Sequence, residues 1–446
     1  MRGPLDWTLA TVAAATRGVI DGDPAMPVGS VGIDSRHVAP GSVFVAVRGE
    51  RFDGHDFAPQ AIAAGAVAAV VEQGCCPDAV PRVDVADTAT ALRDLAAHRR
   101  SELDIPVVGI TGSTGKTSTK DLLASVLAGS WASPRSFNNE VGVPLTVLST
   151  PGDARSLVLE VGSRGLGHIR WLAPAVHPDI AIVTNIGVVH LEMFETRDSI
   201  ADAKWELVES LREGGTAVLP DDEPRLMRAH PGPTVTFGTS PTATVRITDV
   251  EIDDGGIPRF RLHAAGSVAE VELSMVGRHQ ATNAAAAAAA ALALGLGLEE
   301  IVPGLAAATG SPWRMEVIRG RFTIVNDAYN ANPDSMEAGL RTVAAIPGRS
   351  VAVLGLMAEL GSVSEEEHRH IGLLARDLGF SLVFVVGEDH GIAAAAGDIA
   401  RSCADIPTAD AAIRAAIEPG DVVLVKASRA AGLERIAIDL AKEAVA

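Results

Sequence analysis

The stretch Val107-Val108-Gly109-Ile110-Thr111-Gly112-Ser113-Thr114-Gly115-Lys116-Thr117 decides the fold of this chain. It begins with a run typical of a buried strand, and residues 120–127 after it have a helical pattern. Glycines in such a turn let backbone N–H groups surround phosphate oxygens, and the helix start adds positive partial charge. Lys116 would bridge the β- and γ-phosphates of a nucleotide, and Thr117 would bind Mg²⁺. The segment predicts a phosphate-binding loop made of Gly112, Ser113, Thr114, Gly115, Lys116, Thr117 and Ser118.

This loop departs from the common pattern at one position. Ile110 stands where the first glycine of the usual motif would fall, so the loop is a Gly-x-x-Gly-Lys-Thr variant. The alternative interpretation is a glycine-rich turn that holds a lysine by chance. The strand before the loop and the helix after it favour the phosphate loop.

Strand and helix patterns divide the chain into three segments, and we predict three domains: 1–103, 104–313 and 314–446. The second segment has apolar strands without strict alternation, which is typical of a parallel sheet covered on both faces. Within it, residues 245–273 alternate more cleanly and predict an antiparallel hairpin at the sheet's edge. The third segment is again α/β and doubly wound. The predicted fold is α/β, with a central P-loop parallel-sheet ATPase domain and a Rossmann-like C-terminal domain.

Composition narrows the classes of partner. The chain has 446 residues and a formal net charge of -19, which argues against nucleic acid because phosphate neutralisation needs a concentrated basic surface. Three cysteines are interpreted as ordinary thiols of a reducing compartment. The most apolar stretch, residues 284–298, is shorter than the roughly 20 residues that span a bilayer. We therefore expect a cytoplasmic monomer that binds no nucleic acid and does not insert into membranes.

Polar residues follow two other predicted strands. Glu160 ends the strand pattern 157–160, and Asn185 and His190 follow the pattern 180–183. Ligands of α/β sheets gather beyond the carboxyl ends of strands, so Glu160 and His190 are candidate metal ligands and Asn185 a candidate nucleotide contact. A solvated glutamate and a structural histidine are the alternatives. Lys204 lies on a helical pattern, where the sequence alone favours an exposed lysine.

Together these residues resemble the Mur ligase superfamily, from Asp34-Ser35-Arg36 to Val425-Lys426-Ala427-Ser428-Arg429. Residues 49–56 and 327–335 are most similar to the member that joins D-alanyl-D-alanine to UDP-N-acetylmuramoyl-tripeptide. The resemblance implies an ATP-dependent, Mg²⁺-requiring ligase of peptidoglycan synthesis that works through an acyl phosphate. It also implies a first domain for the UDP-sugar substrate, and a C-terminal domain that closes over the nucleotide and binds the amine.

The resemblance implies roles for single residues as well. Lys116, His190 and Lys204 would be catalytic, and a carbamylated Lys204 would be an anion beside magnesium. The implied metal ligands are Thr117, Glu160, His190 and Lys204. The implied nucleotide contacts beyond the loop are Asn185, Asn283, Arg314 and Asp327. The implied substrate contacts are Ser35, Arg36, Gly54, His55, Asn138, Asn139, Tyr329, Asn330, Asn332 and Ser335. For Tyr329, packing against the hinge that leads into the C-terminal domain is an equally good explanation of its presence in this motif.

One position departs from the family, and two other functions stay open. Leu356 stands where the family usually has an acidic residue, which weakens a catalytic role there. The first alternative function is another ligase of the superfamily, adding glutamate to folate or a diamino acid to the muramoyl dipeptide. The second is a non-catalytic nucleotide-sensing protein that kept the fold.

Overall fold

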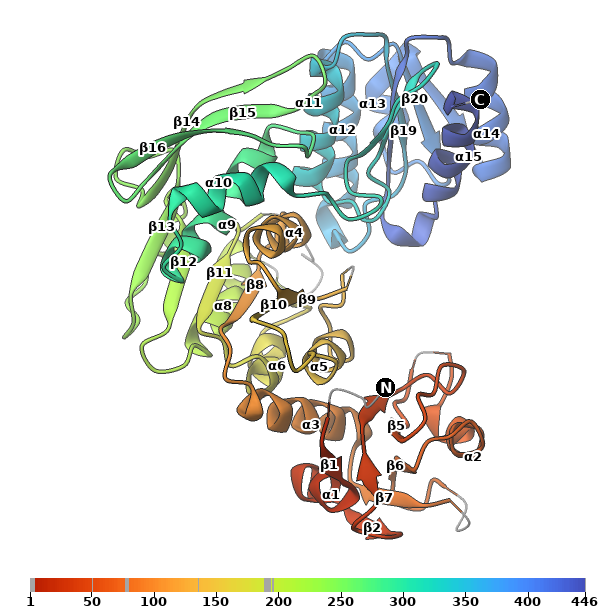
Figure 1. Cartoon of the computed structure of the whole chain (residues 1–446). Coiled ribbons are helices and arrows are strands. Elements are labelled where there is room, and N and C mark those ends of the chain that lie inside the picture. The colour runs from red at the N-terminus through yellow and green to blue at the C-terminus, as the bar shows by residue number, and fades with distance from the viewer. Residues whose placement is uncertain are drawn as a thin grey trace.

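The computed structural model of the chain describes residues 5–49, 51–76, 80–134, 136–187, 194 and 196–445. Three mainly parallel β-sheets, of five, nine and six strands, follow one another along these residues, and helices cover their faces (Figure 1). In that view the N-terminal sheet lies at the bottom, the central sheet at the left and the C-terminal sheet at the upper right. The predicted α/β class is confirmed.

The N-terminal region contains the five-stranded sheet and a separate pair of short strands. Its elements are β1 (Trp7–Thr8), α1 (Leu9–Thr16), β2 (Val19–Asp21), β3 (Pro27–Val28), β4 (Ser30–Gly32), β5 (Ser42–Val45), η1 (Gly54–Phe57), α2 (Ala58–Ala63), β6 (Ala68–Glu72), β7 (Arg82–Val85) and α3 (Thr88–Glu102). The strand order is β2-β7-β6-β5-β4, with β2 antiparallel at one edge. Helix α3 packs on α1 and on two helices of the next region, so one apolar core joins both regions.

The central region contains the nine-stranded sheet, in the order β16-β15-β14-β13-β12-β11-β8-β10-β9. Its elements are β8 (Val107–Thr111), α4 (Lys116–Val126), β9 (Ser130–Ala132), α5 (Gly142–Leu148), β10 (Ser156–Glu160), α6 (His168–Val176), β11 (Ile180–Val183), α8 (Arg197–Glu209), β12 (Thr216–Pro220), η2 (Pro224–Leu226), β13 (Thr234–Gly238), β14 (Val245–Ile252), β15 (Pro258–Ala264), β16 (Ser267–Glu272), α9 (His279–Ala293) and α10 (Leu298–Ala307). In the sheet order, every pair of neighbours from β9 to β14 is parallel. The antiparallel edge predicted for residues 245–273 is confirmed, and it consists of three strands, β14 to β16.

The Ala-rich segment forms the buried helix α9, which lies between the central sheet and α4. Its alanines 284–291 are almost completely buried. Small side chains let helix and sheet approach closely, and this explains how a chain with only 4% aromatic residues fills its core.

The C-terminal region is a six-stranded sheet in the order β17-β18-β22-β19-β20-β21. Its elements are β17 (Glu316–Ile318), β18 (Thr323–Asn326), α11 (Pro333–Ala345), β19 (Ser350–Leu354), η3 (Gly361–Val363), α12 (Ser364–Asp377), β20 (Leu382–Val386), α13 (Ile392–Ala396), η4 (Gly397–Ile399), β21 (Ala400–Cys403), α14 (Ile406–Ala416), β22 (Val422–Lys426), η5 (Arg429–Ala431) and α15 (Glu434–Val445). Only the edge strand β17 pairs in the antiparallel direction among the described strands of this sheet. Separate apolar clusters cover its two faces, as expected for a doubly wound sheet.

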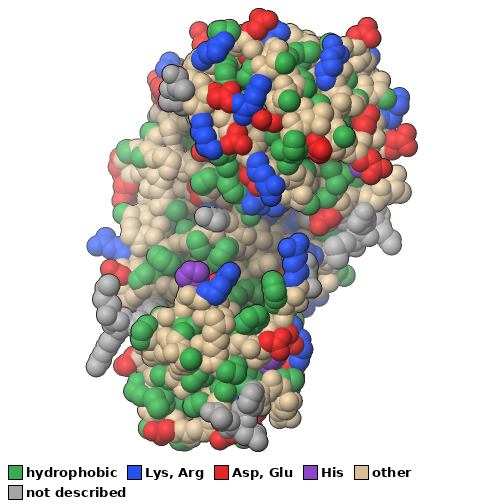
Figure 2. Space-filling view, turned by 90° about the vertical axis from the view of Figure 1, so that its right-hand side faces the viewer, with side chains coloured by type: hydrophobic (Ala, Val, Ile, Leu, Met, Phe, Trp, Pro, Cys, Tyr) green, Lys and Arg blue, Asp and Glu red, His purple; other side chains and the backbone are tan. Residues whose placement is uncertain are grey.

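The parallel register brings the predicted polar residues together. Strand β8 lies between β10 and β11 and is parallel to both, so the segments after Thr111, Glu160 and Val183 begin at the same edge of the sheet. Figure 2 shows that the surface is recessed below the C-terminal lobe, with lysine or arginine side chains near the recess. No helix within the described ranges is both long and apolar enough to cross a bilayer.

Candidate active site

The phosphate loop has the backbone conformation that its glycines allow. It joins β8 to α4, and Gly112 and Gly115 have φ values of 147° and 78°. A Cβ at Gly112 would overlap the hydroxyl of Thr184, and one at Gly115 would overlap the amide of Asn283. Both positions therefore need glycine for conformation and for space. The strand–loop–helix arrangement predicted from the sequence is confirmed.

Asn185 braces the loop from the neighbouring strand β11. Its Oδ1 accepts hydrogen bonds from the backbone N–H groups of Ser113, at 3.1 Å, and Thr114, at 2.9 Å. Its Nδ2 donates to the Thr114 hydroxyl at 2.5 Å. In this structure Asn185 thus sets the shape of the loop, while its predicted contact with nucleotide stays a prediction.

Lys116 is a partly exposed cation at the first turn of α4. Its Nζ donates to the carbonyl oxygens of Gly112, at 2.6 Å, and Ser113, at 3.3 Å. Among the described residues no carboxylate forms an ion pair with it. Burial lowers the pKa of Lys116 to about 8; the nearby Glu160 opposes this shift and Arg314 adds to it. The side chain is therefore a positive charge without a close counter-ion, as a phosphate site requires.

Thr117 and Glu160 form an oxygen-rich group beside Lys116. The Thr117 hydroxyl donates to Glu160 Oε2 at 2.8 Å, and Asn138 Nδ2 donates to Oε1 at 2.7 Å. The backbone N–H of Glu160 donates to Ser133 Oγ at 3.1 Å, which fixes this buried carboxylate at the end of β10. Hydroxyl and carboxylate oxygens are the donors that Mg²⁺ prefers, so the residues present fit the predicted metal.

Lys204 lies deep inside the protein on α8. Only 2% of it is exposed, so the exposed lysine favoured by the sequence alone is wrong. Burial lowers the pKa of Lys204 far below its usual value, and the charge of Lys116 acts in the same direction. That electrostatic interaction places Lys204 near the phosphate loop. The third predicted catalytic residue, His190, lies outside the described residues.

Arg314 lies in the segment between α10 and β17. It reaches the carboxyl edge of the central sheet, where the phosphate loop lies, and we call this the phosphate edge. Its Nη2 donates to Ser136 Oγ at 2.8 Å, and that oxygen lies 3.4 Å from the Thr117 hydroxyl. The guanidinium also stacks over Tyr329, 4.3 Å from the ring centre. This contact gives Tyr329, the only tyrosine of the sequence, a structural role at the hinge, and its predicted contact with substrate stays a prediction. Asn283, predicted as a nucleotide contact, is buried and donates to Gln280 Oε1 at 2.9 Å.

The C-terminal sheet has its own charged group at its carboxyl edge. Lys426, at the end of β22, pairs with Asp327 Oδ2 at 2.5 Å and donates to the carbonyl of Asn330 at 2.9 Å. The other oxygen of Asp327 accepts the N–H of Met315 at 3.1 Å. Sequence analysis assigned no role to Lys426, although its place at the end of an apolar strand is the same signal that singled out Glu160.

Three of the predicted substrate contacts have local structural roles. Asn332 caps α11 by accepting the N–H of Ser335 at 2.9 Å, and Ser335 Oγ accepts the N–H of Asn332. In the central region, Asn139 Oδ1 accepts the N–H of Gly142 at 2.8 Å and starts α5. Contact of these residues with substrate stays a prediction.

The substrate contacts predicted for the first domain lie in the N-terminal region, apart from the phosphate loop. Arg36 pairs with Asp34 and is exposed, and Ser35 Oγ donates to Gln60 at 3.3 Å. Gly54 packs so closely on the backbone of residue 47 that no side chain would fit. His55 is buried, and its Nδ1 lies 2.5 Å from Asp53 Oδ1.

His55, Glu72 and Cys75 lie close enough for a metal ion, but their contacts oppose one. His55 Nε2 accepts the N–H of Glu72 at 2.9 Å, so its lone pair is in use. Arg48 donates to Glu72 Oε2 at 2.8 Å and lies 3.5 Å from Cys75 Sγ. The Arg48 guanidinium already supplies the positive charge that a metal cation would bring to this cluster.

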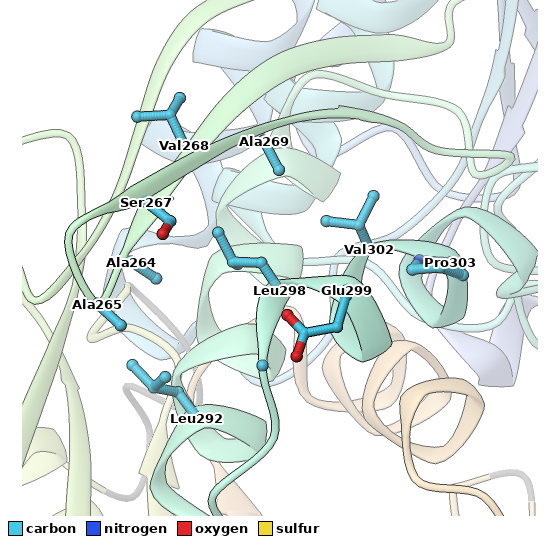
Figure 3. Close-up of a pocket in the computed structure, with 11 residues that line it drawn as sticks. Ala264, Ala265, Ser267, Val268, Ala269, Leu292, Leu298, Glu299, Val302 and Pro303 are labelled. Carbon is cyan, nitrogen blue, oxygen red and sulfur yellow. The ribbon is translucent and has the colours of Figure 1, made fainter.

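One cavity of the described residues lies away from these groups. It measures about 470 Å³ and lies between the β15–β16 turn and α10 (Figure 3). Val302 and Pro303 line it, and the adjacent Gly304 packs on Val126 at the carboxyl end of α4, whereas the phosphate loop lies at the amino end. No predicted site residue lines this cavity.

Fold and site together define a nucleotide-dependent enzyme with three α/β regions, and comparison with known proteins gives the family. The family models "Mur ligase family, catalytic domain", "Mur ligase middle domain" and "Mur ligase, glutamate ligase domain" match residues 27–100, 110–291 and 313–429. The chain belongs to the Mur ligase family, so the resemblance seen in the sequence is confirmed.

Relatives with printed functions are similar over nearly the whole chain. The UDP-N-acetylmuramoyl-tripeptide–D-alanyl-D-alanine ligase of Mycobacterium tuberculosis is 39% identical, and the match covers 97% of each chain. A crystal structure of MurF from Acinetobacter baumannii is 32% identical, with a TM-score of 0.90, and covers 98% of this chain and 100% of that one. MurF ligase from Thermotoga maritima in complex with ADP is 31% identical, with a TM-score of 0.83, over 93% and 97% of the two chains.

Proposed function

We propose that this protein is an ATP-dependent ligase that joins UDP-N-acetylmuramoyl-tripeptide to D-alanyl-D-alanine. One observation carries the proposal: Lys116, Thr117 and Glu160 meet at a single sheet edge, with Arg314 reaching the same edge from the C-terminal side. Such a group binds a triphosphate and neutralises charge during phosphoryl transfer. The substrates follow from the relatives, because the similarity extends through all three regions at 39% identity.

The reaction has three steps that the site supports. An oxygen of the peptide carboxylate attacks the γ-phosphorus of ATP, the bond to the β-phosphate oxygen breaks, and ADP leaves. The amine of the dipeptide then attacks the acyl carbon and loses a proton. Phosphate leaves from the tetrahedral intermediate, and an amide remains. Lys116 and Arg314 stabilise the negative charge that develops on the transferred group, and the closed C-terminal region keeps water from the acyl phosphate.

Thr117 and Glu160 would hold Mg²⁺, and we assign His190 and Lys204 to the same metal site. When bound, the ion would neutralise phosphate charge. Lys204 is suited to carbamylation, because burial lowers its pKa and so raises the share of neutral amine, the form that reacts with CO₂ and releases a proton. The product is an anion beside the positive charge of Lys116.

We divide the enzyme into a UDP-sugar domain (1–103), an ATP domain (104–313) and a closing domain (314–446). One sheet per segment supports this division, as do the ranges of the three family models. The uridine nucleotide would bind near Ser35, Arg36 and His55. The dipeptide would bind near Asn330, where the carboxyl edge of the C-terminal sheet faces the hinge.

Mass spectrometry of the product tests the substrate assignment. The purified chain is given ATP, Mg²⁺, D-alanyl-D-alanine and UDP-muramoyl tripeptides that end in either diaminopimelate or lysine. We expect one tripeptide to gain the mass of the dipeptide less one water, with equimolar phosphate release. Product formation only with glutamate and folate, or with a diamino acid and the muramoyl dipeptide, would assign another ligase of the family. ATP turnover with no acceptor at all would favour the nucleotide-sensing alternative.

Carbamylation is tested by ¹³C NMR in labelled bicarbonate. We expect a carbamate resonance in the wild-type protein and none in the Lys204→Arg variant, which keeps a positive charge but offers no reactive amine. Full activity of the wild-type protein in the absence of that resonance would contradict the assignment.

A further inference from the structure

The segment that carries Arg314 has a strained backbone. Trp313 and Met315, on either side of Arg314, have φ values of 62° and 52°. Residues with a Cβ pay about 1–2 kcal/mol for this left-handed conformation. Such strain persists only where surrounding contacts determine the conformation. Contacts at both ends of the segment must therefore hold Arg314 in place.

The contact at the amino end comes from Asp121, a residue to which neither the sequence analysis nor the comparisons assign a role. Asp121 lies on α4, the helix that begins at the phosphate loop, and 13% of its side chain is exposed. Its Oδ2 accepts two hydrogen bonds from Ser311, one from the backbone N–H at 2.9 Å and one from the hydroxyl at 2.7 Å. Ser311 precedes Arg314 by only three residues, so these two hydrogen bonds fix the Arg314 segment against α4.

The contact at the carboxyl end comes from Asp327 of the C-terminal region, whose Oδ1 accepts the N–H of Met315 at 3.1 Å. On the same side, Glu316 Oε2 accepts the N–H of Trp313 at 3.1 Å. Carboxylates of the central and C-terminal regions therefore hold the segment on both sides of Arg314. Because the central carboxylate is on the phosphate-loop helix itself, the position of Arg314 depends directly on the position of that helix.

Asp121 is also linked, through a chain of polar contacts, to the oxygen-rich group formed by Thr117 and Glu160. Its Oδ1 pairs with Lys120 Nζ at 2.9 Å, and Nζ donates to the carbonyl of Ser133 at 2.9 Å. The Ser133 hydroxyl in turn accepts the backbone N–H of Glu160. Lys120 and Ser133 are buried, so these bonds are shielded from solvent. A single carboxylate therefore joins Arg314 and Glu160 through two short chains of contacts.

We propose that Asp121 is a positioning residue that places Arg314 at the nucleotide phosphates by anchoring Ser311 to the phosphate-loop helix. This inference rests on the proposed nucleotide site and adds to it the residue that couples the C-terminal region to that site. Asp121 does not touch the nucleotide, so its effect on binding passes through Arg314.

A double-mutant cycle on ADP affinity tests the inference. ADP binding is measured by calorimetry in the full-length wild-type protein, Asp121→Ala, Arg314→Ala and the double variant. We expect Asp121→Ala to weaken binding about tenfold, because two hydrogen bonds to a charged group are lost. In the Arg314→Ala background the same change should cost less than about twofold, because the group that Asp121 positions is already gone.

An equal loss in both backgrounds, or no loss in either, would overturn the inference. Asp121→Asn keeps an acceptor for Ser311 but loses the ion pair with Lys120, and we expect at least half of the lost affinity to return. If Asp121→Ala does not fold, Ser311→Ala takes its place in the cycle with an expected loss of about threefold.

Asp405→Ala is the matched control, since Asp405 caps α14 through the N–H of Thr408 at 2.9 Å and has no place in the site. It should lower the melting temperature without changing ADP affinity. Wild-type protein that binds no ADP would refute the proposed function itself. Wild-type binding without coupling between Asp121 and Arg314 would refute only the positioning role.

Discussion

Two sheets of this protein present a buried or partly buried lysine at their carboxyl edge, and the two edges differ in one respect. At the central sheet, Lys116 and Lys204 have no carboxylate in ion-pair contact among the described residues, and burial lowers the pKa of both. At the C-terminal sheet, Lys426 is paired with Asp327 at 2.5 Å and bonded to a carbonyl. Lysines near the carboxyl edges of the two sheets are therefore unpaired among the described residues at one edge and fully paired at the other.

Whether a lysine is paired indicates whether it serves ligand binding or stability. A desolvated positive charge without a counter-ion costs free energy, and the protein recovers that cost only when an anion arrives. A paired charge is already satisfied and offers nothing to a ligand. Lys116 should therefore matter to nucleotide binding, while Lys426 should matter to stability. Four predictions test this distinction, from the largest expected effect to the smallest.

Lys116→Ala should lower phosphate release at least about a thousandfold, because a preorganised charge at the transferred group is lost. Thermal unfolding should stay the same or shift upward, since the change removes an uncompensated charge. Steady-state phosphate release and calorimetry measure the two effects. If Lys116→Ala lost stability as well as activity, Lys116 would have a structural role like that of Lys426, and the distinction between the two lysines would be wrong.

Lys426→Met should have the opposite effect. It leaves the Asp327 carboxylate without its partner and should destabilise the C-terminal region by about 3 kcal/mol. Denaturant unfolding followed by hydrogen exchange in β18 and β22 measures this loss. The double variant Lys426→Met with Asp327→Asn should recover part of it, because no charge is then left unpaired. Unchanged stability of the single variant would contradict the structural role of Lys426.

ADP affinity should fall as pH rises above about 8, by up to about tenfold per pH unit. The sign follows from the lowered pKa of Lys116: below about 8 the free protein holds the charged amine that phosphates need, and above that pH it has lost the proton. Calorimetry between roughly pH 7 and 9.5 measures the slope. Lys116→Arg serves as the control, since a guanidinium stays charged and should flatten the profile. A wild-type profile equally flat would show that another group carries the charge.

Ser136→Ala should raise KM for ATP about fivefold with little change in kcat, because Arg314 loses one hydrogen bond of about 1 kcal/mol. Initial-rate kinetics separate the two parameters. Ser149→Ala is the comparison, since the Ser149 hydroxyl donates only to the carbonyl of Thr146 within its own helix end. An equal effect of both variants on KM would contradict a role of Ser136 in positioning Arg314 at the nucleotide phosphates.

Much of the central site could be predicted because its signals are local. The glycines and Lys116 lie within one strand–loop–helix unit, and Glu160 ends an apolar strand whose parallel partner is β8. The helix cap formed by Asn332 and Ser335 was equally local, and an Asn-Pro start with serine at the third helical position is its usual signal. It was missed because the same residues belong to the motif that carried the substrate assignment.

The sequence alone therefore determined the class of fold, the phosphate loop and the strand ends where ligands gather. These depend on backbone conformation and apolar periodicity over a few residues. Tertiary structure alone decided which charges stay unpaired: whether Lys204 is buried, that Lys426 meets Asp327 across 99 residues, and that Asp121 meets Ser311 across 190. Burial and pairing depend on which distant segments the packed sheets bring together, and no local pattern encodes that distance.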